Sequence, residues 1–204
     1  MNNAFNKDYY ESGISKGISG YENYKWMPNR SFEEAITITE TLKCKNFLDY
    51  GCAKGFLVNA LRLLEFEAYG EDISDYAINN CHPNVEGFIS KPTNKFYDLI
   101  FCKDVLEHVP ENDLPNLLTN FSKRCNQFFA VVPFADNGLY RIREYEVDVT
   151  HVTRGDETWW LELFRDSGFK IKTFSYKWGD LKKKWIPINE YANGFFHLES
   201  KKID

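Results

Sequence analysis

A carboxylate followed by glycines stands at the end of an apolar run in FLDYGCAKGF, residues 47–56. Asp49 ends the run, Gly51 and Gly55 follow, and a helix-like stretch begins directly afterwards. Glycines let a backbone pass close to a ligand, and the first N–H groups of a helix face the same place. Asp72 lies 23 positions after Asp49, a spacing at which a carboxylate can accept hydrogen bonds from ribose hydroxyl groups. The pattern predicts a site for a ligand that carries a nucleoside.

The neighbouring residues argue against a phosphate-bearing ligand. A dinucleotide fingerprint would need glycines where this chain has Ala53 and Phe56, and a P-loop would need its lysine after the last glycine rather than before it. Asp49 would also repel a phosphate group, whereas it would attract an ammonium or sulfonium group. We therefore expect a nucleoside that carries positive charge.

Three segments resemble successive motifs of class I S-adenosylmethionine-dependent methyltransferases: FLDYGCAKGFLVNAL, AYGEDISDYAI and FYDLIFCKDVLEHVP. The last contains DVLEHV, which marks a common subgroup, here of the small-molecule type, and the resemblance covers about residues 46–110. DVTHVTRGDETWWLELFRDSGF is similar to the C-terminal half of many members. The family motif D/E-x-G-x-G-x-G has Ala53 in place of its middle glycine, which adds one methyl group where the backbone approaches the cofactor.

The resemblance implies a set of residues that bind S-adenosylmethionine. Asp49, Gly51 and Gly55 would surround its methionine portion, and Cys52 and Ala53 of the same loop would also bind the cofactor.

The remaining cofactor contacts come from three later segments. Asp72 would hold the ribose and Ile73 would line the adenine. The backbone around Cys102 and Lys103 would take the amino group of the cofactor. No acid follows the third predicted strand, where many members contact the adenine amine.

Two histidines are candidates for catalysis. His151 lies past the fifth predicted strand, where a neutral imidazole suits a general base that removes a proton from a hydroxyl group. The alternative is a histidine packed beside Trp159 or Trp160. His108, after Glu107, is the weaker candidate, and its alternative role is to shape the loop through hydrogen bonds. No spacing of His, Asp or Glu resembles a metal site, so none is expected.

From Asn46 onward, short apolar runs alternate with helix-like stretches, which predicts an α/β fold with a parallel sheet covered by helices on both faces. A helix over DETWWLELFRDSG ends at Gly168, and two late strands follow in FKIKTFSY and GFFHLES. The resemblance adds a Rossmann-like, seven-stranded, mostly parallel sheet whose last strand is antiparallel.

Two domain-level segments are expected. Residues 1–31 mix glycines with tyrosines, which favours an ordered helical and aromatic lid, and residues 32–204 form the methyltransferase domain. Ser31 and Glu34 form a capping box for a helix that runs to about Leu42. The basic segment LKKKW, residues 181–185, predicts a solvated strip.

Composition limits the classes of function. The 204 residues suit one domain, and a net charge of −5 makes nucleic acid an unlikely partner. Five cysteines without a C-x-x-C pair indicate buried thiols in a reducing, cytoplasmic location. No apolar run reaches the length of a membrane span.

The expected function is methyl transfer from S-adenosylmethionine, by in-line displacement, to a hydroxyl group of a small metabolite or glycan unit. Three alternatives remain: N-methylation of a small amine or protein side chain, a cofactor-binding subunit without catalysis, and an oxidoreductase that binds NAD, against which the missing glycines argue. The sequence sets no oligomeric state.

Overall fold

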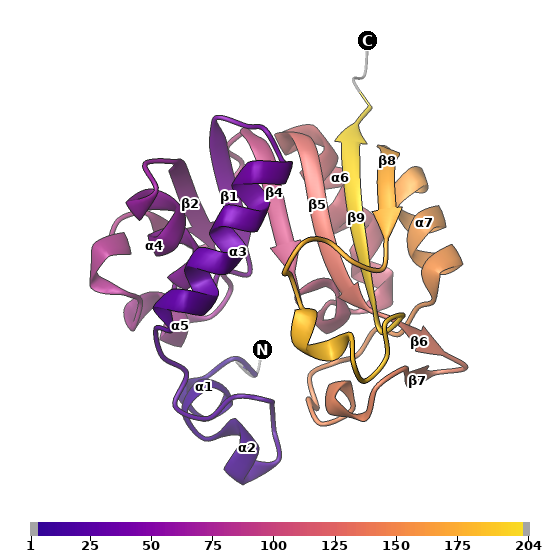
Figure 1. The fold of residues 1–204 in the computed structure, drawn as a ribbon, viewed down its shortest axis with the longest axis horizontal. Coiled ribbons are helices and arrows are strands. Elements are labelled where there is room, and N and C mark those ends of the chain that lie inside the picture. Colours follow the sequence, from indigo (N-terminus) through magenta and orange to yellow (C-terminus); the bar gives the residue numbers. More distant parts are fainter. Residues whose placement is uncertain (1–3, 202–204) are drawn as a thin grey trace.

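A seven-stranded sheet with the order β3-β2-β1-β4-β5-β9-β8 forms the centre of the computed structural model, which describes residues 4–201 (Figure 1). Its strands are β1 (Asn46–Tyr50), β2 (Glu67–Glu71), β3 (Ile89–Ser90), β4 (Tyr97–Lys103), β5 (Cys125–Pro133), β8 (Phe169–Ser175) and β9 (Asn193–Ser200). β1 pairs in parallel with β2 and β4, whereas β9 is antiparallel to both β5 and β8. The predicted Rossmann-like sheet, with its last strand antiparallel, is therefore confirmed.

Helices cover both faces of this sheet. The α-helices are α1 (Lys7–Glu11), α2 (Gly13–Lys16), α3 (Pro28–Thr41), α4 (Phe56–Leu63), α5 (Asp75–Asn79), α6 (Leu114–Arg124) and α7 (Glu157–Asp166). The core residues of α3 and α4 belong to one hydrophobic cluster, and those of α6 and α7 belong to another. Phe128 and Phe129 of β5 enter different clusters, because successive side chains of a strand point to opposite faces.

The connections hold short elements. They are the hairpin strands β6 (Ala135–Asp136) and β7 (Leu139–Tyr140) and the 3-10 turns η1 (Pro83–Val85), η2 (Leu106–His108), η3 (Glu111–Asp113), η4 (Arg143–Tyr145) and η5 (Lys183–Trp185). Gly168 follows α7 with φ +94°, so the predicted helix end is confirmed.

The N-terminal segment packs below the carboxyl ends of the parallel strands (Figure 1). Its helix α3 begins at Pro28, not at the predicted Ser31, because proline suits the first helical position and Met27 before it is extended. The Ser31 N–H donates to the Met27 carbonyl at 3.1 Å, so Ser31 already belongs to the helix. Residues 1–3 of the proposed lid (residues 1–31) and residues 202–204 of the proposed methyltransferase domain (residues 32–204) lie outside the described part of the chain.

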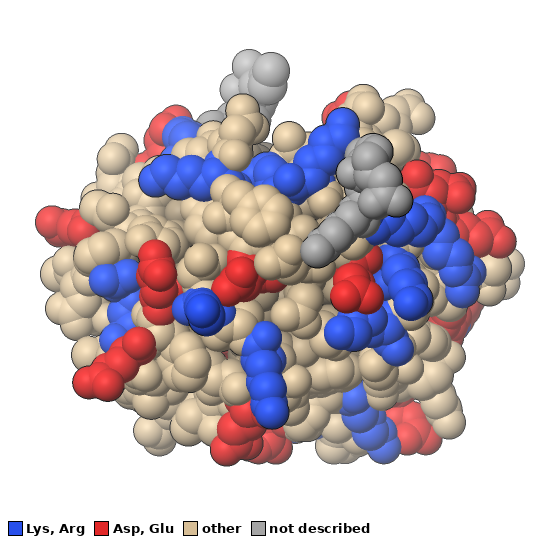
Figure 2. Space-filling model, turned by 90° about the horizontal axis from the view of Figure 1, so that it is seen from above, with Lys and Arg blue, Asp and Glu red and all other residues tan. Residues whose placement is uncertain are grey.

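The opposite end of the sheet carries charges of both signs (Figure 2). Lys and Arg side chains lie among Asp and Glu there, so this face is not uniformly basic. The cysteines are all free thiols; three are buried as predicted, whereas Cys44 and Cys81 are partly exposed. Among residues 4–201, no helix is long and apolar enough to cross a membrane.

Candidate active site

The loop after β1 turns through three left-handed residues, with φ values of +78° at Gly51, +49° at Ala53 and +73° at Gly55. Asp72, after β2, holds this loop: one carboxylate oxygen accepts the Ala53 N–H and the other accepts the Ser74 N–H, each at 2.7 Å. The sequence analysis did not predict this role of Asp72, which links the loop after β1 to the end of the neighbouring strand β2.

The two glycines also have a packing reason. A Cβ atom at Gly51 would lie 2.2 Å from the Val105 side chain, and one at Gly55 would lie 2.8 Å from that of Val85. Besides any approach of the backbone to a ligand, these positions therefore need glycine for the loop to pack.

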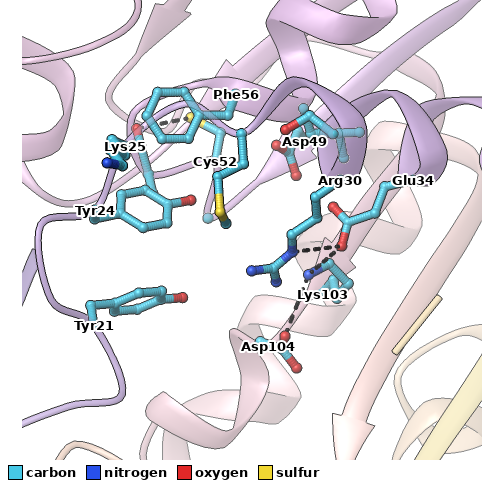
Figure 3. A pocket seen from close by; sticks show the side chains of 15 residues that line it. Tyr21, Tyr24, Lys25, Arg30, Glu34, Asp49, Cys52, Phe56, Lys103 and Asp104 are labelled. Carbon is cyan, nitrogen blue, oxygen red and sulfur yellow. Dashed lines mark hydrogen bonds and ion pairs between the residues drawn. The ribbon is translucent and has the colours of Figure 1, made fainter. Parts of the chain in front are cut away.

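A pocket opens beside this loop at the carboxyl ends of β1 and β4 (Figure 3). Five of the predicted cofactor residues line it: Asp49, Gly51, Cys52, Ala53 and Lys103. Gly55, Asp72, Ile73 and Cys102 do not line it. Cys102 is wholly buried in the core, whereas the side chain of Ile73 is exposed.

Helix α3 contributes charged residues that the sequence analysis did not assign. Lys103 Nζ lies 3.1 Å from a Glu34 carboxylate oxygen and 3.4 Å from one of Asp104, and Arg30 Nε lies 4.0 Å from Glu34 (Figure 3). Lys25 lines the pocket as well. The rim of the pocket thus carries charges of both signs.

Asp49 is the most deeply placed acid of the pocket, and its pKa is raised to about 7. The main cause is burial, which disfavours the charged carboxylate. Lys103 opposes the rise, whereas Glu34 and Asp72 add to it. A cationic ligand would favour the ionised form.

Aromatic residues of the N-terminal segment form the other wall. Tyr21 and Tyr24 line the pocket beside Phe56, across from Arg30 (Figure 3). Lys54 of the β1 loop ties the segment down, with its Nζ 2.5 Å from Glu11 and 3.0 Å from the Tyr24 carbonyl oxygen. The pocket between these walls has a volume of about 100 Å³.

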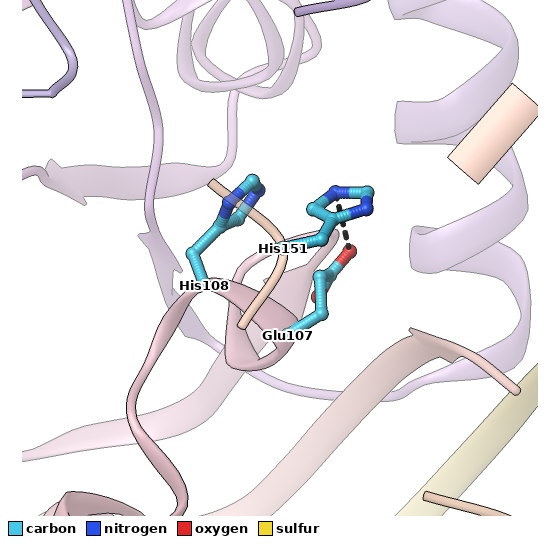
Figure 4. A group of neighbouring side chains, drawn as sticks. All are labelled: Glu107, His108 and His151. Carbon is cyan, nitrogen blue, oxygen red and sulfur yellow. Dashed lines mark ion pairs between the residues drawn. The ribbon is translucent and has the colours of Figure 1, made fainter. Parts of the chain in front are cut away.

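Three chemically active side chains meet beyond the end of β4: Glu107, His108 and His151 (Figure 4). The histidine ring centres are 4.6 Å apart, and His151 Nε2 lies 4.0 Å from Glu107 Oε1. The N–H groups of Val152 and Thr153 donate to the Glu107 carbonyl at 2.9 and 3.0 Å, which holds the distant loop against the turn.

The alternative position for His151, beside Trp159 or Trp160, is wrong. Its aromatic neighbours are instead His108, Tyr140 and Tyr145. The sequence analysis expected no metal site because no short sequence spacing of His, Asp or Glu resembled one. Such spacing cannot reveal that Glu107 and His108 lie beside the distant His151.

Hydrogen bonds fix the proton positions of both rings. The Thr150 hydroxyl donates its one proton to Asp148 at 2.6 Å, so towards His108 Nδ1, 2.7 Å away, it acts as an acceptor. His151 Nδ1 lies 2.7 Å from the Tyr145 carbonyl oxygen, which only accepts. Both Nδ1 atoms therefore carry hydrogen, and both Nε2 atoms present a lone pair when the rings are neutral.

Burial keeps these groups uncharged. It lowers the pKa of His108 to about 4, aided by the neighbouring His151, and it lowers the pKa of His151 as well. It raises the pKa of Glu107 to about 8, with Asp104 adding to the effect. In the described part of the chain neither carboxylate oxygen of Glu107 has a hydrogen-bond partner, although the residue is 1% exposed.

The segment predicted as a solvated basic strip enters the site. Lys182, with φ +57°, forms an ion pair with Asp104 and donates to the Tyr145 hydroxyl at 2.8 Å. Its side chain is only 7% exposed, so the prediction is wrong for this residue. Nothing in the sequence LKKKW distinguishes Lys182 from the two lysines that follow it.

Solved structures with the same fold come from several organisms. A chain from the Haloferax volcanii complex of the Trm112 methyltransferase activator with a protein described as a methyltransferase is 12% identical, with TM-score 0.64, 86% of this chain and 92% of that chain covered. An S-adenosylmethionine-dependent methyltransferase from Clostridium acetobutylicum is 11% identical, with TM-score 0.61, covering 85% and 92%. The magnesium protoporphyrin IX methyltransferase of Synechocystis PCC 6803, with bound SAH, is 14% identical, with TM-score 0.60, covering 85% and 83%. These likenesses show the fold.

No curated protein matched the sequence. A family model does match, and it spans three quarters of the chain, from the N-terminal tyrosines through β8. Because this model, described as a methyltransferase domain, matches residues 21–174, the chain belongs to the methyltransferase-domain family.

Proposed function

We propose that the protein methylates a hydroxyl group of a small polar molecule or glycan unit, with S-adenosylmethionine as the donor. One observation carries the proposal: the turn that follows β4 leads directly from the pocket to the histidine cluster. Lys103 and Asp104 line the pocket, and Glu107 and His108 follow within four residues. A donor in the pocket and an acceptor at the cluster would be neighbours.

The pocket suits the donor by charge. The methionine portion of S-adenosylmethionine bears an ammonium, a sulfonium and a carboxylate group, and the pocket offers both signs. Asp49 and Glu34 would face the cations, while Arg30 and Lys25 would face the carboxylate. The SAH found in the Synechocystis structure supports the choice of donor.

The other cofactor contacts are proposed from the sequence. Asp72 retains lone pairs for ribose hydroxyl groups after its two backbone bonds. Ile73 is exposed beside it, free to cover the adenine. The backbone at Cys102 and Lys103, at the end of β4, would take the amino group of the cofactor.

The chain supplies a proton acceptor for the reaction. S-adenosylmethionine, when bound, would supply the methyl group: its S–C bond would break, with the electron pair left on sulfur, as the acceptor oxygen forms the O–C bond. The hydroxyl proton goes to Nε2 of His151, which Tyr145 leaves unprotonated. Glu107 Oε1 lies 4.0 Å from this nitrogen, and loss of the Glu107 proton as the imidazolium forms would stabilise the new charge. His108 donates to Thr150 and orients the cluster.

The test is a panel of sugars, phenols, hydroxy acids and amines, with production of S-adenosylhomocysteine as the readout. A hydroxyl acceptor should turn over, and His151→Ala should lower kcat by roughly 10²–10⁴-fold with cofactor affinity unchanged. N-methylation, the first alternative, needs little base catalysis, so near-normal turnover of His151→Ala would favour it. A non-catalytic subunit would bind the cofactor in isothermal titration and turn over nothing. A cytoplasmic location stays a prediction.

A further inference from the structure

The cluster of Glu107, His108 and His151 has the composition of a metal site. Its potential ligand atoms, one from each residue, all lie within 4.8 Å of one another (Figure 4). Metal–nitrogen and metal–oxygen bonds of about 2.0–2.2 Å place neighbouring ligand atoms roughly 3–4 Å apart. Small side-chain rotations therefore suffice to close the cluster around an ion.

Glu107 supplies an observation that points to a ligand. Both of its carboxylate oxygens are buried without a hydrogen-bond partner in the described residues. A buried polar group without partners is costly and rare in folded proteins, so it demands an explanation. A bound cation between the carboxylate and the two imidazoles would supply the missing partner.

The surrounding hydrogen bonds prepare both histidines as ligands. His108 donates from Nδ1 to Thr150, which is itself held by Asp148, and His151 donates from Nδ1 to the Tyr145 carbonyl. Metal-bound histidines commonly donate their second ring N–H in this way, which fixes the tautomer and turns the free nitrogen to the ion.

We propose that Glu107, His108 and His151 bind one divalent transition-metal ion through a carboxylate oxygen and two Nε2 atoms. Imidazole with carboxylate suits Zn²⁺, Mn²⁺, Fe²⁺ or Co²⁺, whereas Mg²⁺ and Ca²⁺ favour all-oxygen sets. Three protein ligands leave coordination positions open, as in catalytic metal sites. Its catalytic role rests on the proposed function: the open position would take the acceptor hydroxyl oxygen and lower the pKa of that hydroxyl group. The proton would then pass to solvent water as the O–C bond forms, and His151 would serve as a ligand in place of the base named above.

The test uses CoCl₂ as the probe, added to the full chain after treatment with a chelator. We expect one Co²⁺ per chain, a visible absorption band and displacement by ZnCl₂. We expect at least tenfold weaker binding in each of three variants: Glu107→Gln, His108→Gln and His151→Gln. The control is His197→Gln on β9, which places an amide beside Gln127 and should not weaken binding. Thr150→Val should weaken binding by about 10–100-fold through the lost partner of His108.

Circular dichroism establishes that each variant is folded. Absence of saturable Co²⁺ binding by the folded chain, or equal binding by folded cluster variants, would overturn the site. Isothermal titration with S-adenosylmethionine separates this outcome from the function. Cofactor binding without Co²⁺ binding removes the metal and leaves the methyltransferase proposal. Co²⁺ binding without cofactor binding supports the site and counts against that proposal.

Discussion

Single residues of the loop after β1 hold an unusual backbone conformation. Ala53 stands at φ +49°, where a residue with a Cβ atom pays roughly 1–2 kcal/mol. The family motif has glycine there, so the observed conformation is the one that the motif predicts, kept in spite of the added methyl group. The Ala53 N–H bond to Asp72 explains how it is held.

We expect Asp49 to make both stability and cofactor binding depend on pH. Its pKa in the folded chain, about 7, lies above the ordinary value of 3.8, so between these values the folded state binds more protons than the unfolded state. Its contribution to stability therefore falls as pH rises from about 4 to 7 and is constant above. Because a cationic ligand favours the ionised carboxylate, S-adenosylmethionine affinity should rise up to roughly tenfold from pH 6 to pH 8.

Isothermal titration of the wild type and Asp49→Asn checks this expectation. The variant should bind more weakly at pH 8 and lose most of the pH dependence. Lys103, Glu34 and Asp72 face Asp49, so Glu34→Gln serves as the control that changes the local charge and keeps the titrating group. An identical pH profile in the Asp49→Asn variant would contradict the assignment.

At the scale of elements, we propose that the N-terminal segment, whose Tyr21 and Tyr24 line the pocket, acts as a lid. Because the pocket volume of about 100 Å³ is smaller than the roughly 300–1,000 Å³ of ligand sites, we expect the segment to shift when the cofactor enters. Lys54→Met removes the ion pair between the β1 loop and Glu11. We expect up to about fivefold faster cofactor association, because a partly buried pair contributes roughly 1 kcal/mol.

Stopped-flow quenching of tryptophan fluorescence, with Trp26 in the lid segment, measures this rate. Lys16→Met is the matched control, since its ion pair with Asp8 joins two residues within the segment. Equal association rates for both variants and the wild type would exclude the Lys54 pair as the latch.

Helices and strands with a strong local pattern were predictable from the sequence, whereas contacts between residues far apart in the sequence were not. The apolar runs gave β1, β2, β4 and β5, because a strand buried on both faces is continuously apolar. The start of α3 was predicted at Ser31 from its capping box with Glu34, but Pro28 is also a helix-start signal and the helix begins there. The contact between His151 and His108 depends on backbone hydrogen bonds from Val152 and Thr153 to Glu107. Because such bonds involve no side chains, no sequence pattern predicts them.

For the whole molecule, a buried ion pair links the β2 end of the sheet to the helix before β5. Arg124 Nη2 lies 2.8 Å from Glu71 Oε1, and the two side chains are 6% and 1% exposed. Thr93 also donates to this carboxylate oxygen, at 2.6 Å from its hydroxyl group. The pair therefore connects three separated segments of the chain.

Arg124→Met should lower the free energy of unfolding by about 3–5 kcal/mol, because it leaves the Glu71 carboxylate buried with only neutral donors. Glu71→Gln combined with Arg124→Met removes both charges and should recover much of the loss, since a paired buried charge contributes little net stability over neutral groups of similar size. Urea denaturation of the three chains, compared by midpoint at equal slope, measures both effects. A double variant as unstable as Arg124→Met would show that lost packing of the arginine stem, rather than the uncompensated carboxylate, sets the cost.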